Sequence, residues 1–326
     1  MKASVVMPVK NEASCIASVI EALFQQSRPP EEVVITDGGS KDSTKDIIKS
    51  YISRGLPIKL IEEGRSYPGE GRNIAIKNSS YDLIAMLDAG LVIGHDWLKE
   101  LLMPLEQDST IDGVYGNYYF KPVSLNEKAL VISYFFAGHK HIKSFSDGRV
   151  SVYPSSESLA IRKEVFIKTG GFDVNLATGE DFIYFKKLRK LNMAVSENAS
   201  VFRPLPVHNL KEAFKRSYLN ARYFMLAKHR GLILRSLIFF PIYIIGLALT
   251  VLAYYVNILL MVVWVMVFFL LRVLPKVNIA IKTGFVKNKL PLALILLTGM
   301  YIFFSDIAYM AGYSVGLIKL VVKPKL

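Results

Sequence analysis

MKASVVMPVKNEASCIASVIEALFQQSRPPEEVVITDGGSKDST, residues 1–44, sets the pattern of the N-terminal part of the chain. Two short apolar runs, residues 3–7 and 32–36, have the length and composition of buried strands. Between them, apolar residues recur at the spacing of one face of a helix, as Ile16, Val19, Ile20 and Leu23. A strand, a helix and a strand in this order predict a βαβ unit with parallel strands.

The same alternation continues beyond this unit. It predicts an α/β fold with a mostly parallel sheet and helices on both faces, and it places ligands at the carboxyl ends of the strands. The pattern becomes more mixed after residue 112. The further expected strands are 58–61, 83–87, 113–120 and 158–161, and the further expected helices are 42–53, 71–77, 126–145 and 181–191.

The charge of the chain is unevenly distributed. Residues 1–210 contain 25 Lys and Arg and 25 Asp and Glu, whereas residues 211–326 contain 15 basic and 2 acidic residues, which accounts for the net charge of +13. A nucleic-acid-binding domain needs a basic face, and the neutral first part gives no support for one. Basic residues beside apolar segments are typical of cytoplasmic loops and of contacts with anionic lipid headgroups.

The basic part of the chain also contains long apolar segments. Residues 237–271 include no charged side chain, and their length fits two tight membrane-spanning helices, followed by a basic loop that starts at Arg272. Residues 291–318 form a third apolar stretch that contains Asp306, and its topology stays open. We therefore expect a globular domain over 1–210, a basic amphipathic segment over 211–235 and an α-helical membrane domain over 236–326.

The compartment follows from the first residues and from the cysteine content. The chain begins with a strand-like pattern that lacks the layout of a signal peptide, and Cys15 is the single cysteine, as expected in a reducing compartment. We expect a multi-pass protein of the plasma membrane with its globular domain in the cytosol.

Polar motifs follow the predicted strands. MPVKNE (residues 7–12) and TDGGSKDST (36–44) end the first two strands, and GEGRNIAI (69–76) precedes LDAG (87–90). Asp37 and Asp88 each follow a buried strand, so both carboxylates are expected in one crevice. Arg72 can pair with a phosphate, and a carboxylate beside a diphosphate acts mainly through a divalent cation.

A fourth motif, GGFDVNLATGED (170–181), ends in two adjacent acids. Glu180 and Asp181 open a helix, where the helix dipole stabilises carboxylates, and in isolation they could simply cap it. An exposed carboxylate at such a loop edge also suits a general base that deprotonates a hydroxyl group.

The four motifs in this order resemble the family-two inverting glycosyltransferases of the GT-A fold, over residues 3–215. The resemblance implies a nucleotide-diphosphate sugar as donor, Mg²⁺ or Mn²⁺ as cofactor, Asp181 as catalytic base and Glu180 on the acceptor side. Asp88 would be the first acid of the metal motif, with His208 near the metal or the diphosphate. The implied donor-binding residues are Pro8, Val9, Glu12, Asp37, Arg72 and Asp88.

Two positions depart from the family pattern. Gly90 stands where a second metal-binding acid is expected, which puts the dependence on a metal in doubt. The Gln-x-x-Arg-Trp signature of processive synthases is absent, and the corresponding region reads KRSYLNARYF (215–224), which favours transfer of a single sugar.

The expected function is transfer of one sugar, with inversion, to a lipid-linked or membrane-associated acceptor. Two alternatives stay open. A polyprenyl-phosphate glycosyl synthase would use a phosphate acceptor, which needs no base, and a non-catalytic membrane scaffold would keep a degenerate nucleotide-sugar site. All three depend on Asp37, Asp88 and Asp181 lying at one cleft.

Overall fold

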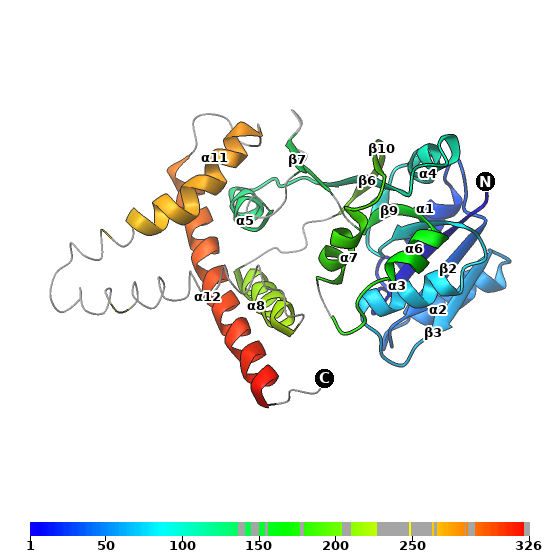
Figure 1. The fold of residues 1–326 in the computed structure, drawn as a ribbon, viewed down its shortest axis with the longest axis horizontal. Coiled ribbons are helices and arrows are strands. Elements are labelled where there is room, and N and C mark those ends of the chain that lie inside the picture. The colour runs from blue at the N-terminus through cyan, green and yellow to red at the C-terminus, as the bar shows by residue number, and fades with distance from the viewer. Residues whose placement is uncertain are drawn as a thin grey trace. The chain divides into compact units, whose positions relative to one another are not determined.

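The structure is a computed structural model in which the chain divides into two compact units (Figure 1). The first unit comprises Met1–Phe120 and Ser151–Pro204, and the second comprises Lys121–Val150 and Leu205–Leu326. The structure describes residues 1–135, 141–144, 150–153, 156–176, 179–203, 210–226, 248, 263, 266–283, 285 and 291–322.

The first unit is built on a mixed sheet with the strand order β3-β2-β1-β4-β9-β6-β10-β5. The pairs β3–β2, β2–β1, β1–β4 and β6–β10 are parallel, whereas β9 runs antiparallel to both β4 and β6, and β5 antiparallel to β10. The strands are β1 (Ala3–Val9), β2 (Glu32–Asp37), β3 (Ile58–Glu62), β4 (Leu83–Leu87), β5 (Val92–Ile93), β6 (Gly113–Phe120), β8 (Val150–Tyr153), β9 (Ser158–Arg162) and β10 (Met193–Phe202).

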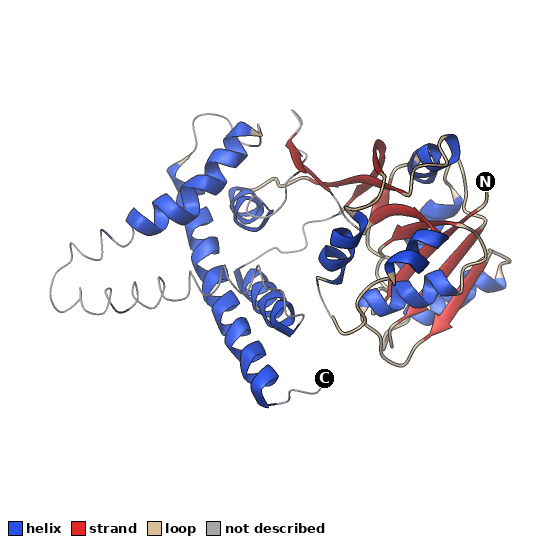
Figure 2. Cartoon of the chain, viewed as in Figure 1, coloured by secondary structure: helices blue, strands red, loops and turns tan. Residues whose placement is uncertain are grey.

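Helices pack against these strands (Figure 2). In β4, Ile84 and Met86 belong to a buried cluster that also contains residues of α3, α6 and α7. Neighbouring residues of a strand point to opposite faces, and all five residues of β4 are buried, so both faces of this strand are covered. The helices are α1 (Ile16–Phe24), α2 (Thr44–Ser53), α3 (Pro68–Lys77), α4 (Trp97–Gln107), α6 (Lys163–Thr169) and α7 (Glu180–Leu188).

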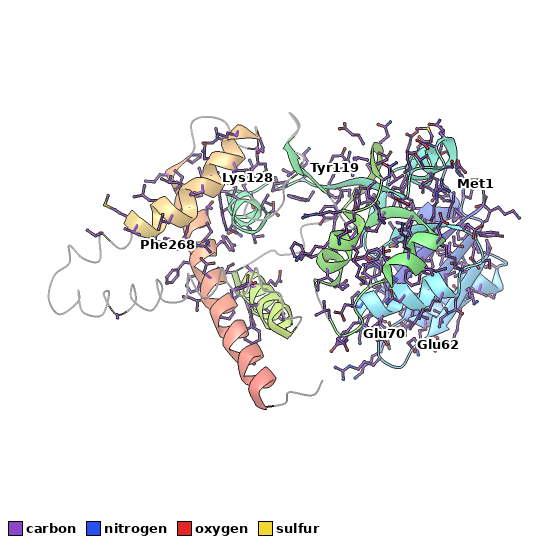
Figure 3. The ribbon with its side chains drawn as sticks, in the orientation of Figure 1. Met1, Glu62, Glu70, Tyr119, Lys128 and Phe268 are labelled. Atoms are coloured by element: carbon purple, nitrogen blue, oxygen red, sulfur yellow. The ribbon has the colours of Figure 1, made fainter. Side chains whose placement is uncertain are left out.

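The strand predictions for the first unit are confirmed, and the α1 residues predicted to face inward are all buried. Helix predictions were less accurate. The helix expected over 126–145 is wrong at its end, because α5 stops at Phe135 and His141–Ser144 form the strand β7. Side chains of the unit are drawn in Figure 3, where Glu62 marks the end of β3 and Glu70 lies in α3.

In the second unit, the elements of the described residues are helices and the strand β7. Its long helix α12 packs along α8 and α5, and the phenol of Tyr301 donates a hydrogen bond of 2.6 Å to Asn126 Oδ1. The elements are α5 (Leu125–Phe135), α8 (Leu210–Leu226), the π-helical turn η1 (Phe269–Val273), α11 (Leu274–Lys282) and α12 (Leu292–Val322). The loop expected after residue 271 is wrong over 272–282, which continue as helix.

One helix among the described residues is long and apolar enough to cross a membrane. Its window, Leu292–Tyr309, has a mean hydropathy of 1.8. The two spans predicted within 237–271 lie outside the described residues except for 248, 263 and 266–271. The large apolar side chains exposed on the described helices of this region are Val263, Met266, Val267, Leu270, Leu271, Leu274, Ile279, Leu292, Leu296, Met300 and Phe304.

Asp306, whose role the sequence left open, has a definite partner. Its Oδ2 accepts a hydrogen bond from Arg272 Nε at 3.0 Å, and its Oδ1 accepts one from Arg272 Nη2 at 2.5 Å. This bidentate contact connects η1 to the middle of α12. Pairing offsets the cost of holding a charge in an apolar helix.

We expect Asp306→Asn to lower the free energy of unfolding by about 1–3 kcal/mol, because it removes the carboxylate charge that pairs with Arg272 in an apolar setting. Thermal unfolding of the full chain in detergent micelles would measure the effect. The double variant Arg272→Met with Asp306→Leu should recover most of the loss. An unchanged melting temperature for the single variant would contradict this role of the pair.

Candidate functional site

A pocket of about 220 Å³ lies in the first unit at the carboxyl ends of its parallel strands. It is built where β1, β2 and β4 end, because parallel strands bring their carboxyl ends to one edge of the sheet. The lining residues are Pro8, Val9, Lys10, Glu12, Thr36, Gly38, Ser66, Tyr67, Pro68, Arg72, Asp88, Ala89 and Arg203. Five of the predicted site residues therefore line one pocket.

Arg72 holds this site together. It is 2% exposed, and it donates from Nη2 to Asp88 Oδ1 at 2.5 Å and from Nη1 to Glu180 Oε1 at 2.9 Å. Burial disfavours its charge, but the charges of Asp88 and Glu180 outweigh burial and raise the pKa of Arg72. Arg72 Nε is buried and has no hydrogen-bond partner among the described residues.

The two acids of the fourth motif have different environments. Glu180 is 6% exposed, and burial raises its pKa although the Arg72 charge opposes this. Asp181 is half-buried, and its charge also acts on Arg72. Glu180 thus anchors the start of α7 to Arg72, while Asp181 is the acid of the pair that a solute can reach.

Helix α7 can approach Arg72 because position 69 has no side chain. A Cβ on Gly69 would lie 2.9 Å from Glu180 Cγ and 3.1 Å from Phe172 Cβ. The ring of Phe172 lies against the guanidinium of Arg72, with 5.5 Å between the ring centroid and Cζ. The glycine of the third motif is therefore required by the packing of α3 against the fourth motif.

Asp37 ends β2, but its carboxylate turns into its own loop. The side chain is buried, and Oδ2 accepts hydrogen bonds from the backbone of Gly39 at 3.1 Å and of Ser40 at 2.9 Å. Ser40 Oγ donates to the other carboxylate oxygen and accepts from the backbone of Asn11 at 2.8 Å. Asp37 therefore shapes the loop that presents Gly38 to the pocket, and it is not itself a lining residue.

Glu12 lies beside the position of the missing metal-motif acid. Gly90 has a φ of +80°, and a Cβ built on it would be 4.0 Å from Glu12 Oε2. The thiol of Cys15 donates to the same oxygen at 3.1 Å, and burial together with Glu12 raises the pKa of Cys15 to about 11. The carboxylate of Glu12 therefore occupies the side of Asp88 toward which a second motif acid would project.

Within the described part of the chain, no group of three His, Cys, Asp or Glu side chains forms a metal site. The carboxylates of Glu12 and Asp88, which line the same pocket, are hard oxygen ligands of the kind that Mg²⁺ and Mn²⁺ prefer. Donor phosphates would have to complete such a site. His208, the other predicted ligand, lies outside the described residues.

Among the residues that the sequence analysis missed are Arg203 and Glu157, which form an ion pair at the site. Arg203 lines the pocket, and its Nη1 donates to Glu157 Oε1. A usable signal existed for Arg203, because it follows directly after β10 as Asp88 follows after β4. Glu157 carries no such signal, since it precedes an antiparallel strand.

The chain matches the family described as Glycosyl transferase family 2 over residues 4–170. It is 26% identical over 219 residues to glycosyltransferase AglE of Haloferax volcanii. The matched region covers 66% of this chain and 70% of AglE. The chain spans about a fifth to a quarter of the length of several other curated relatives.

Solved structures with a similar fold include two glycosyltransferases. The mannosyltransferase PcManGT from Pyrobaculum calidifontis, in complex with GDP-Man and Mn²⁺, has a TM-score of 0.52 and 17% identity and covers 100% of this chain and 88% of its own. S. aureus TarS 1-349 in complex with UDP-GlcNAc has a TM-score of 0.50 and 20% identity and covers 68% of this chain and 66% of its own. These likenesses show a fold of the GT-A type.

We expect Arg72→Lys to reduce stability by about 1–3 kcal/mol, because a lysine is a point charge that cannot bridge Asp88 and Glu180 at once. Thermal unfolding would measure the loss. The matched control is Arg65→Lys, at an exposed position, which should leave the melting temperature unchanged. Equal melting temperatures for the two variants would contradict a bridging role for Arg72.

Proposed function

The chain belongs to glycosyl transferase family 2 and is a glycosyltransferase that uses nucleotide-sugar donors, and on this premise we propose that it transfers a single sugar, with inversion, to an acceptor at a membrane surface. The observation that carries the proposal is the Arg72 bridge. Arg72 joins Asp88, in the pocket, to the helix that begins with Glu180 and Asp181. Family membership favours an enzyme over the non-catalytic scaffold.

The donor would lie in the pocket between the ends of β1 and β4. Pro8 and Val9 offer an apolar edge for the base, and the Asp37 loop presents the backbone of Gly38. Arg72 lines the pocket and would place a positive charge near the donor phosphates. Asp37, which the resemblance implies to be a donor-binding residue, would thus contribute to donor binding by shaping its loop.

The transfer would be a single displacement. Asp181 takes the proton of the acceptor hydroxyl, the acceptor oxygen forms a bond to the anomeric carbon, and the bond from that carbon to the diphosphate oxygen breaks with its electron pair on the oxygen. Attack opposite to the leaving group inverts the configuration. The half-buried position of Asp181 beside the buried Glu180 supports this role.

A divalent cation would neutralise the leaving diphosphate when bound. Asp88 and Glu12 are the carboxylates that would hold it with the donor phosphates, and His208 remains a predicted ligand. Support comes from the position of the Glu12 carboxylate, on the side of Asp88 where the motif lacks an acid.

The second unit would hold the enzyme at the cytosolic face of the plasma membrane. The apolar window in α12, the exposed apolar side chains of η1 and α11, and the basic composition of residues 211–326 support attachment through helices. Attachment favours a lipid-linked or membrane-associated acceptor. The number of spans stays a prediction.

We expect Asp181→Asn to reduce the transfer rate to a hydroxyl acceptor by about 10²–10⁴-fold, because the general base is lost. Transfer to a polyprenyl phosphate needs no base and would keep substantial activity. Assays of sugar transfer with both acceptor types would measure the difference. Asp46→Asn, at an exposed position of α2, is the control and should behave like the wild type. Wild-type rates for Asp181→Asn with every acceptor would contradict the role of Asp181 as a base.

We expect Glu12→Gln and Asp88→Asn each to weaken Mn²⁺ binding in the presence of a nucleoside diphosphate by about tenfold or more, since each removes a carboxylate ligand. Electron paramagnetic resonance of free and bound Mn²⁺ would measure the affinity without any turnover. Glu21→Gln, in α1, serves as the control. Unchanged Mn²⁺ affinity for Glu12→Gln would show that Glu12 is not a ligand.

A further inference from the structure

Arg203 is a second arginine of the pocket, and its position follows from the sheet topology. Strand β10 is parallel to β6, and both β6 and β4 run antiparallel to β9. The carboxyl end of β10 therefore lies at the same edge of the sheet as that of β4. Arg203 comes directly after β10, and its backbone N–H donates to Tyr119 O at 2.9 Å, which fixes the point from which its side chain starts.

The Arg203 side chain is positioned by Glu157 and lies close to Tyr118. Its Nη1 donates to Glu157 Oε1, and Tyr118 lies close enough to act on the charge of the guanidinium. Glu157 lies beside Asp88 because β9 pairs with β4 in the register Leu87↔Ser158. Burial alone would lower the pKa of Arg203, but the charge of Glu157 outweighs it and raises that pKa, so the guanidinium stays charged.

The two arginines of the pocket are engaged differently. Arg72 has 3% of its side chain exposed and bridges two carboxylates, whereas Arg203 has 27% exposed and lines the pocket. A guanidinium has five N–H donors, so an arginine anchored by one carboxylate keeps donors for a ligand. Arg72 is chiefly a structural bridge, whereas Arg203 is the more exposed of the two arginines that line the pocket.

We propose that Arg203 binds the diphosphate of the donor and of the released nucleoside diphosphate, and that Glu157 is the positioning residue that holds it there. This inference rests on the proposed function. When the bond to the anomeric carbon breaks, its electron pair stays on the diphosphate oxygen, and a guanidinium at that oxygen stabilises the added charge. Arg203 would also offset the carboxylates of Glu12 and Asp88, which repel an anionic ligand.

A guanidinium at the diphosphate would partly replace the charge stabilisation that an incomplete metal motif cannot supply. With Gly90 in place of an acid, fewer protein carboxylates are available for a cation. A fixed guanidinium supplies charge stabilisation without a metal and presents paired donors to a phosphate. Binding of a nucleoside diphosphate should therefore persist in a chelator, weakened but measurable, through Arg203.

The test is calorimetric titration of the full chain in detergent with UDP, UMP and uridine, and with GDP, GMP and guanosine, in the presence of EDTA or of Mn²⁺. The diphosphate that binds the wild type, UDP or GDP, determines whether the uridine or the guanosine ligands are used with the variants. We expect Arg203→Gln to weaken binding of that diphosphate by about 10- to 100-fold, the range for loss of hydrogen bonds to a charged group, and to leave binding of its nucleoside unchanged. Glu157→Gln should weaken binding of the same diphosphate by a smaller factor.

The outcomes separate the possible roles of Arg203. Equal weakening of diphosphate and nucleoside would mean that Arg203 only supports the fold, and unchanged diphosphate binding would also overturn the inference. If neither diphosphate nor any nucleotide-sugar binds the wild type, the proposed function itself fails. Arg162→Gln would not be a suitable control because its side chain holds backbone carbonyls, whereas Arg65→Gln, at an exposed position, is a suitable one.

A measurement on the wild type covers the case in which Arg203→Gln does not fold. Phenylglyoxal modifies accessible arginines, and mass spectrometry of the digested chain reports each site. The bound diphosphate should slow modification of Arg203 by about tenfold, as expected from charged hydrogen bonds to it, while the nucleoside should not. Equal protection by both, or no protection by either, would overturn the inference.

Discussion

The bridge made by Arg72 is the interaction on which the site depends. Its guanidinium joins Asp88, just after β4, to Glu180, at the start of α7, and these positions are far apart in the sequence. A buried arginine between two carboxylates has its charge compensated, whereas removing the arginine would leave two neighbouring carboxylates without their cation. The bridge therefore couples the stability of the fold to the geometry around Asp181.

The antiparallel strand β9 gives the pocket its second set of charges. If β9 ran parallel to β4, Glu157 would lie at the opposite edge of the sheet. Because it runs antiparallel, its first residues meet the carboxyl end of β4, and Glu157 reaches Arg203 at the end of β10. The result is two arginine–carboxylate groups at one edge, one that supports the structure and one that faces the pocket.

The second unit shows the same principle in an apolar setting. Arg272 and Asp306 are charges within apolar helices, and each is tolerable there because the other is its partner. An acid in an apolar stretch suggested either a functional group or a packing role when only the sequence was considered. The contact with Arg272 identifies Asp306 as a group that fastens α12 to η1.

Local patterns in the sequence determined the βαβ order, the strands β1, β2, β3, β4, β6 and β9, and the four motifs, because apolar periodicity and strand-end residues depend on neighbours in the chain. The strands β5, β8 and β10 were not predicted. The strand directions beyond β4, the burial of Asp37 in its own loop and the approach of Arg203 and Glu157 to Asp88 were decided by the tertiary structure alone. Helix ends were also misjudged, as at residues 141–144, where pairing between strands outweighs local preference. Such features arise from pairings between distant segments, which leave no periodic signal in the sequence.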